Sequence, residues 1–219
     1  MTNVINPTES FRFDGAIWRI VPGEEPFLAI EVRNDQELEV KFFVLDLQSM
    51  NLKEVKDDQL DWWVSLIAYT TDRLSFKRYE VEGNPFTGES FIWDQKKNQI
   101  RPSERLSQGR THQRFRFPVL YTPDTKGHGD FVKFLASKGV ETKLGIEYLE
   151  WDKYLILSYH LAQESRFDRK IMVTDDKGNL IIHESLDEKN SGVAFESFLT
   201  FSNLLIFVRN RNELVFYSA

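Results

Sequence analysis

A run of cationic residues at alternate positions is the part of this sequence best suited to bind an anion. The members of the run are Arg110, His112, Arg114 and Arg116. On a β-strand they would share one face, with Phe115 and Phe117 on the other. Guanidinium groups bind carboxylates and phosphates through paired hydrogen bonds. The run therefore predicts a site for a small anionic ligand or an acidic protein. The alternative is a solvated strand face whose charges pair with nearby carboxylates.

A second candidate is the pair His128 and Asp130, which follows a loop rich in glycine. Residues two apart could share a metal ion, or act as a base and the acid that orients it. The alternative is a surface histidine beside a capped helix start. The glycine spacing does not match a phosphate-binding loop, and no GxSxG nucleophile motif is present. Because the chain has no cysteine, thiolate metal sites and cysteine catalysis are excluded. We expect no metal site and no cofactor.

Five tryptophans could form an aromatic surface for sugars or cations, or could pack between sheets. They are Trp18, Trp62, Trp63, Trp93 and Trp151. On a strand, adjacent Trp62 and Trp63 would point to opposite faces, so one of them is expected to be exposed. Glu31 and Arg33 would share a strand face and form a surface ion pair of little energetic value.

Short apolar runs with period-two alternation are expected to form the strands that position these residues. One set begins at Phe27, Arg73, Phe115, Tyr154 and Leu204. The separations of about 40–50 residues are typical of four-stranded propeller blades. In a second set, Asp46, Asp94 and Asp175 each end a strand. The carboxylate of each is expected to accept the backbone N–H two residues on and so to form a turn.

These patterns predict an all-β protein, a propeller-like ring of about five small antiparallel sheets that forms one domain over residues 1–219. The N-terminal segment around Ser10–Phe13 is expected to pair beside the C-terminal strand, which closes the ring. A short helix is expected at residues 131–138, with Asp130 as its N-cap and Gly139 at its end. A second helix is possible near residues 52–60. A lipocalin-like barrel with an apolar interior is the alternative architecture.

The tryptophan pattern and the closing segment Asn203–Leu214 resemble an uncharacterised family of bacterial propeller-like proteins, a domain of unknown function. The tryptophans concerned are Trp18, Trp62-Trp63 and Trp93, the last followed by Asp94. The resemblance covers nearly the whole chain and implies a propeller-like fold. It implies no activity and no site residues.

Composition and charge limit which partners and which cellular location are expected. The net charge of −6 and pI near 5.4 argue against nucleic acid as a partner. No apolar stretch reaches the about 18 residues of a membrane span, and no signal peptide is recognisable, so we expect a cytoplasmic protein away from membranes. The leading hypothesis is a non-catalytic module that binds a protein or a small ligand. The alternative is a hydrolase or lyase with carboxylates and histidines at the mouth of a central channel.

Overall fold

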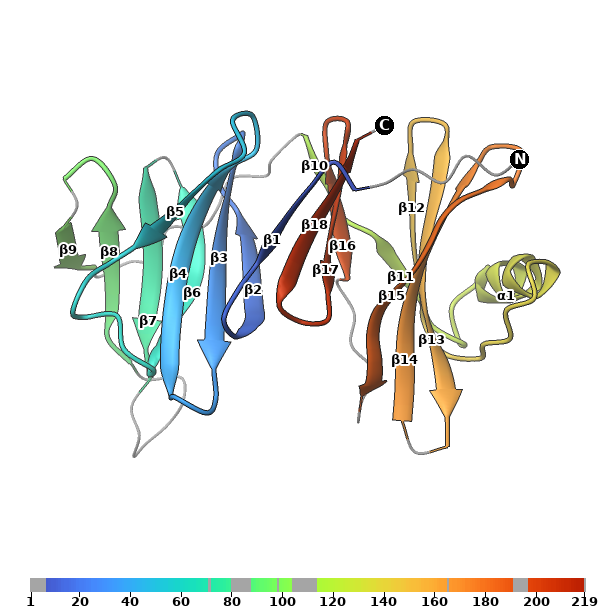
Figure 1. Ribbon diagram of the computed structural model, residues 1–219, viewed down its shortest axis with the longest axis horizontal. Coiled ribbons are helices and arrows are strands. Elements are labelled where there is room, and N and C mark those ends of the chain that lie inside the picture. The colour runs from blue at the N-terminus through green and yellow to red at the C-terminus, as the bar shows by residue number, and fades with distance from the viewer. Residues whose placement is uncertain are drawn as a thin grey trace. The chain divides into compact units, whose positions relative to one another are not determined.

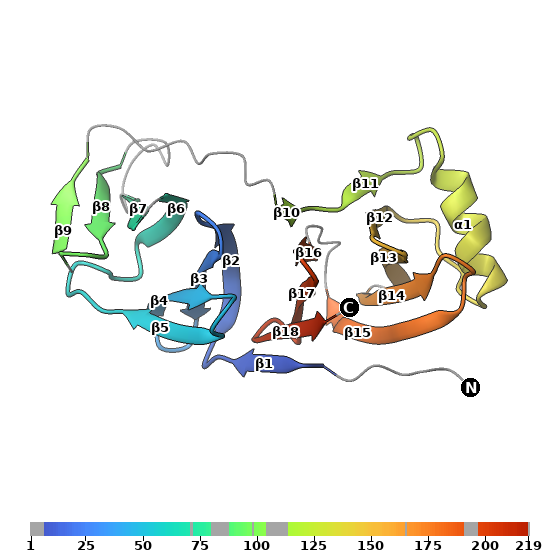
Figure 2. The same ribbon diagram turned by 90° about the horizontal axis from the view of Figure 1, so that it is seen from above.

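The computed structural model describes residues 7–70, 72–79, 88–97, 99–103, 114–164, 166–190 and 197–218. Within these ranges the chain forms four antiparallel sheets and one helix (Figures 1 and 2). The all-β prediction is therefore confirmed. Two compact units divide the chain. We call Phe13–Gln113 the 13–113 unit, and Met1–Arg12 together with Arg114–Ala219 the 114–219 unit.

The 13–113 unit consists of two four-stranded meanders, ordered β2-β3-β4-β5 and β6-β7-β8-β9. The strands are β2 (Ala16–Pro22), β3 (Phe27–Asn34), β4 (Glu39–Asp46), β5 (Asn51–Val55), β6 (Val64–Thr70), β7 (Arg73–Arg78), β8 (Ser90–Asp94) and β9 (Gln99–Pro102). Alternation along β4 buries Val40, Phe42 and Val44 while the residues between them are less buried. Phe42 packs edge-on against Phe76 of β7, with ring centroids 4.8 Å apart. Both meanders thus contribute to one apolar core.

Two five-stranded sheets and the helix make up the 114–219 unit. One sheet has the order β1-β18-β17-β16-β10 and the other β11-β12-β13-β14-β15. The strands are β1 (Glu9–Arg12), β10 (Phe115–Arg116), β11 (Val119–Tyr121), β12 (Ile146–Trp151), β13 (Tyr154–Gln163), β14 (Arg166–Asp175), β15 (Leu180–Asn190), β16 (Phe198–Phe201), β17 (Leu204–Arg209) and β18 (Glu213–Ser218). One apolar core includes residues of both sheets, and a second lies under helix α1 (His128–Ser137).

The described residues contain four sheets, where the repeat spacing predicts about five. The repeat that begins at Phe115 does not form a sheet of its own. Its first two residues become β10 and pair with β16, and residues 119–121 become β11 and pair with β12. Pro118 between them has no N–H to donate to a ladder, so the run breaks there. The four separate sheets also differ from the single closed sheet of a lipocalin-like barrel.

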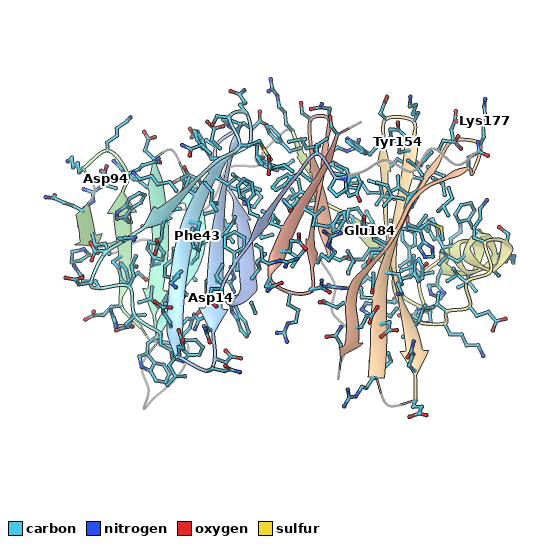
Figure 3. All side chains as sticks on the ribbon, in the orientation of Figure 1. Asp14, Phe43, Asp94, Tyr154, Lys177 and Glu184 are labelled. Carbon is cyan, nitrogen blue, oxygen red and sulfur yellow. The ribbon has the colours of Figure 1, made fainter. Side chains whose placement is uncertain are left out.

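The aspartates that end strands form the turns predicted for them. The carboxylate of Asp46 accepts the N–H of Gln48 at 2.8 Å. Asp94 accepts the N–H of Lys96 at 3.1 Å, and Asp175 accepts that of Lys177 at 3.0 Å. Figure 3 shows Asp94 and Lys177 at the ends of their hairpins. Burial raises the pKa of the Asp46 carboxyl, but hydrogen bonds from Gln48 and Ser49 outweigh it and hold the pKa below the usual value. At Asp175 the side-chain hydrogen bond from Asn179, with the backbone N–H groups of Asn179 and Lys177, lowers the pKa of the carboxyl.

Two predictions about the chain's path are confirmed and two need correction. Strand β1 pairs antiparallel with β18, as expected for the N-terminal segment. The predicted helix is present and starts three residues earlier, at His128. Its N-cap is Gly127 with a positive φ and no side-chain cap, so Asp130 lies inside the first turn and is not the cap. Residues 51–55 form β5, where a second helix was considered possible.

Candidate functional site

The alternating cationic run is only partly within the described residues. Arg110 and His112 lie outside them. Arg114 and Arg116 are exposed, and Phe115 between them is buried against Phe201, with ring centroids 4.7 Å apart. The predicted alternation therefore holds from 114 to 116. It fails at Phe117, which is 51% exposed, because β10 ends at Arg116 and Pro118 redirects the chain.

His128 and Asp130 serve different purposes and do not form a pair. The His128 side chain is buried, and its Nε2 is 2.8 Å from the carbonyl oxygen of Leu144. Asp130 is exposed and lies 3.6 Å from the ammonium of Lys133 on the next turn of α1. Among the described residues, no group of three or more histidine, aspartate or glutamate side chains is placed to hold a metal ion. His128 instead ties the start of the helix to the segment at residues 140–144.

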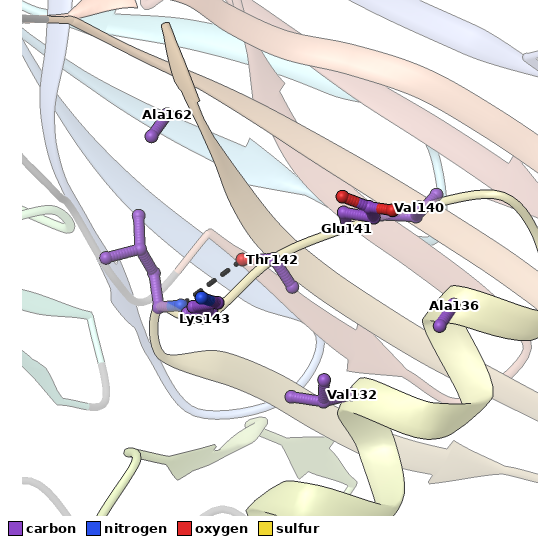
Figure 4. Close-up of a pocket in the computed structure, with 8 residues that line it drawn as sticks. Val132, Ala136, Val140, Glu141, Thr142, Lys143 and Ala162 are labelled. Atoms are coloured by element: carbon purple, nitrogen blue, oxygen red, sulfur yellow. Dashed lines mark hydrogen bonds between the residues drawn. The ribbon is translucent and has the colours of Figure 1, made fainter. Parts of the chain in front are cut away.

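That segment and α1 enclose a pocket of about 420 Å³, shown in Figure 4. Val132 and Ala136 come from α1, and Ala162 from the end of β13. The remaining lining residues belong to the 140–144 segment: Val140, Glu141, Thr142, Lys143 and Leu144. Pockets that bind small molecules commonly have volumes of about 300–1,000 Å³ and walls that are mostly apolar. The volume of this pocket lies within that range, and its walls are mostly apolar.

Polar groups in the pocket wall are already used or carry opposite charges. Thr142 is buried, and its hydroxyl donates to the carbonyl oxygen of His160 at 2.6 Å and accepts the N–H of Leu144 at 3.3 Å (dashed in Figure 4). Glu141 and Lys143 are both exposed and flank Thr142 in the sequence. The wall therefore has one cation and one anion, and the rest of its surface is mostly apolar.

The 140–144 segment is held at both ends, so the pocket has a fixed wall. The N–H of Val140 donates to the carbonyl oxygen of Leu135, and Gly139, with φ +77°, donates to that of Ala136 as α1 ends. Thr142 fastens the middle to β13, and His128 fastens Leu144 to the start of the helix. The sequence predicts a ligand-binding role for His128, whereas its contact with Leu144 holds the wall of the pocket in place.

The pocket residues were not predicted from the sequence. Ala136, Ala162, Val132 and Leu144 belong to apolar patterns that occur throughout the chain. Gly139 and the apolar stripe of α1 did predict where the helix ends. Nothing in the sequence indicates that the segment after Gly139 crosses back over the helix to leave a space.

The tryptophans divide between packing and exposure. Trp93 and Trp151 are buried, while Trp18 and Trp63 are 56% and 44% exposed. The prediction that one of Trp62 and Trp63 is exposed is confirmed by Trp63, although both lie in a turn rather than a strand. The guanidinium of Arg33 lies over the rings of both Trp18 and Trp62, at 5.6 and 4.9 Å from their centroids.

The Glu31–Arg33 pair is buried, so the prediction of a surface ion pair was wrong. The Glu31 side chain is fully buried, and its carboxylate accepts Arg33 Nε at 2.7 Å. It also accepts the Ser65 hydroxyl at 3.0 Å and the N–H of Leu66 at 2.8 Å. Arg33 donates further to the carbonyl oxygens of Trp62 and Val64. Apart from the ion pair, which lies within β3, each of these contacts joins β3 to β6 or to the turn before it, so the pair links the two meanders.

No protein-family model matches this chain, and no curated protein matches it. Among solved structures, it is similar to the crystal structure of TolB from Acinetobacter baumannii, with 11% sequence identity and a TM-score of 0.28. The match covers 93% of this chain and 44% of that chain, so this chain spans less than half the length of the structure it matches. A similarity of this strength supports no conclusion about activity. No helix within the described ranges is long and apolar enough to cross a membrane.

Proposed function

We propose that this protein is a non-catalytic binding module, and that the pocket between α1 and the 140–144 segment binds a small, mostly apolar, uncharged molecule. The observation that carries the proposal is the apolar pocket of about 420 Å³ with a wall fixed by Thr142 and His128. A wall that is held in place before binding reduces the entropy lost when a ligand is ordered. The cytoplasmic location expected from the sequence remains part of this proposal.

A matched series of ligands that differ only in their head group tests the proposal. The probes are a straight-chain alcohol, carboxylate and amine of equal length, each measured by thermal shift. A ligand at about 100 times its dissociation constant adds about 2.7 kcal/mol, which for a chain of this size is about 5–10 °C. Because Glu141 and Lys143 offset each other, we expect the alcohol to bind at least as well as either charged probe.

Matched variants on α1 locate the binding. Ala136→Trp places a large ring at the pocket, and we expect it to abolish the shift. Lys133→Trp adds the same ring at an exposed helical position outside the pocket lining, and we expect it to leave the shift unchanged. The proposal is wrong if no probe of the series shifts the wild type, or if the two variants respond alike.

The propeller-like ring is a second part of the proposal, in this case with four sheets as blades. Its support is the arrangement of β2–β5 and β6–β9 as four-stranded meanders, together with the pairing of β1 with β18, which joins the two ends of the chain in one sheet. A compact chain of this length has a radius of gyration of about 17 Å. Small-angle scattering would contradict a closed ring if it gave a clearly larger value.

A further inference from the structure

Exposed apolar side chains are concentrated in one short segment of the 114–219 unit. Six large apolar residues are exposed among the described residues, and three of them lie within four consecutive positions: Phe117, Val119 and Leu120. Val119 is 57% exposed. Single exposed apolar residues are ordinary, but a contiguous group is typical of an interaction surface. The pocket under α1 uses none of these residues.

The same segment forms the edge of a sheet. Val119–Tyr121 is β11, the first strand in the order β11-β12-β13-β14-β15, so it has a strand partner on one side only within the described part of the chain. Its outward N–H and C=O groups are a template on which another strand can pair. Natural proteins usually protect such edges with charged side chains. Here Val119 and Leu120 are apolar and exposed.

Charge indicates what kind of strand would pair there. Arg114 and Arg116, just before the edge, are both exposed, and residues 114–121 contain no aspartate or glutamate. The chain as a whole has a net charge of −6, so this is a local positive region on an acidic protein. Complementary charge at the border of an interface steers encounter and excludes partners of the wrong sign.

We infer that the edge of β11 binds an extended protein segment in which acidic residues alternate with apolar ones. The segment would add a strand beside β11 through main-chain hydrogen bonds. Its apolar side chains would cover Val119 and Phe117, and its carboxylates would lie near Arg114 and Arg116. Backbone pairing supplies the affinity in this arrangement, while the arginines select for acidic sequences.

Fluorescence anisotropy with a labelled ten-residue peptide tests this inference. In the probe peptide glutamate alternates with valine, and in the comparison peptide lysine replaces glutamate. We expect only the acidic peptide to bind, and we expect its affinity to fall as the salt concentration is raised. A version with alternate backbone nitrogens methylated cannot form the ladder, so we expect it not to bind.

Charge reversals on two edge strands provide the matched control. Arg116→Glu should lower the affinity for the acidic peptide by at least about tenfold. Arg101→Glu makes the same change on β9, an edge strand of the 13–113 unit, and should leave the affinity unchanged. Both residues are exposed, and circular dichroism with thermal melting checks that each variant is folded.

Four results would overturn the inference. They are no binding of the acidic peptide, equal binding of the lysine peptide, equal weakening by both variants, and unchanged binding after backbone methylation. Binding of a single-stranded oligonucleotide that Arg116→Glu abolishes, without peptide binding, would assign the patch to nucleic acid instead. The Ala136→Trp variant should bind the peptide normally, which separates this surface from the pocket.

Discussion

Both units contain a buried glutamate, but its surroundings differ. In the 13–113 unit, Glu31 accepts hydrogen bonds from Ser65 and Leu66 and from the guanidinium of Arg33. In the 114–219 unit, Glu147 of β12 accepts the hydroxyl and the N–H of Ser197, just before β16. In each case a carboxylate on one sheet satisfies a serine and a backbone N–H on the chain that enters the next sheet. The Glu31 link contains Arg33, whose guanidinium lies over the rings of Trp18 and Trp62.

In both units a buried carboxylate joins two sheets, but we expect the two links to contribute different amounts to the free energy of unfolding. A buried carboxylate is stable only when its lone pairs are occupied. The charged partner of Glu31, Arg33, is itself nearly buried. Removing the Glu31 carboxylate therefore leaves a nearly buried guanidinium without its anionic partner. The 114–219 unit adds a separate link, in which Arg209 bridges Glu184 at 2.9 Å and Glu213 at 3.0 Å. Glu184 lies between β15 and the neighbouring sheet in Figure 3.

The largest expected effect comes from removing the Glu31 carboxylate. Glu31→Ala leaves the Nε of Arg33 and the N–H of Leu66 without their acceptor, and we expect the free energy of unfolding to fall by about 3–5 kcal/mol. Glu147→Ala should lower the free energy of unfolding by about 1–3 kcal/mol, because the hydroxyl and the N–H of Ser197 lose their acceptor. Urea unfolding followed by tryptophan fluorescence gives both values. Equal losses would contradict the larger effect expected at Glu31.

An intermediate effect is expected for the bridge at Arg209. The guanidinium lowers the pKa of the Glu213 carboxyl below 4.5. A carboxyl with a depressed folded-state pKa stabilises the fold above its unfolded pKa, and this contribution is lost as pH falls through the folded value. Arg209→Met should therefore lower the free energy of unfolding at pH 7 by about 1–2 kcal/mol. It should also flatten the loss of stability below pH 4.5.

The pH profile of unfolding distinguishes this bridge from simple packing. If Arg209→Met lowers stability by the same amount at pH 3 and pH 7, the side chain acts through its contacts and not through the Glu213 charge.

The smallest effect is expected at the tryptophan rings over Arg33. Trp18→Ala removes one of two rings that lie over the guanidinium, which at a partly exposed site is worth about 0.5–1 kcal/mol. Trp63→Ala removes an exposed ring of the same size and should change stability by less than about 0.5 kcal/mol. Thermal unfolding of the two variants side by side gives the difference, and a Trp63 variant at least as damaged as Trp18→Ala would contradict it.

Local signals in the sequence were reliable where one short-range interaction decides the outcome. The turns at Asp46, Asp94 and Asp175 and the helix end at Gly139 follow from contacts within a few residues. The repeat spacing located the strands but overcounted the sheets, since Pro118 divides the third repeat between two edges. The candidate pair His128 and Asp130 was not brought together, because a two-residue spacing at a helix start sends one side chain inward and the other to solvent.

The sequence by itself determined the strand class, the positions of the main turns and the one helix of the described residues. It did so because period-two burial and turn hydrogen bonds are properties of neighbouring residues. Tertiary structure alone decided that Glu31 is buried and that the 140–144 segment leaves a pocket beside α1. It also left Val119 exposed at a sheet edge. Burial, cavities and edges depend on what residues far away in the chain occupy the adjoining space, and no local pattern records that.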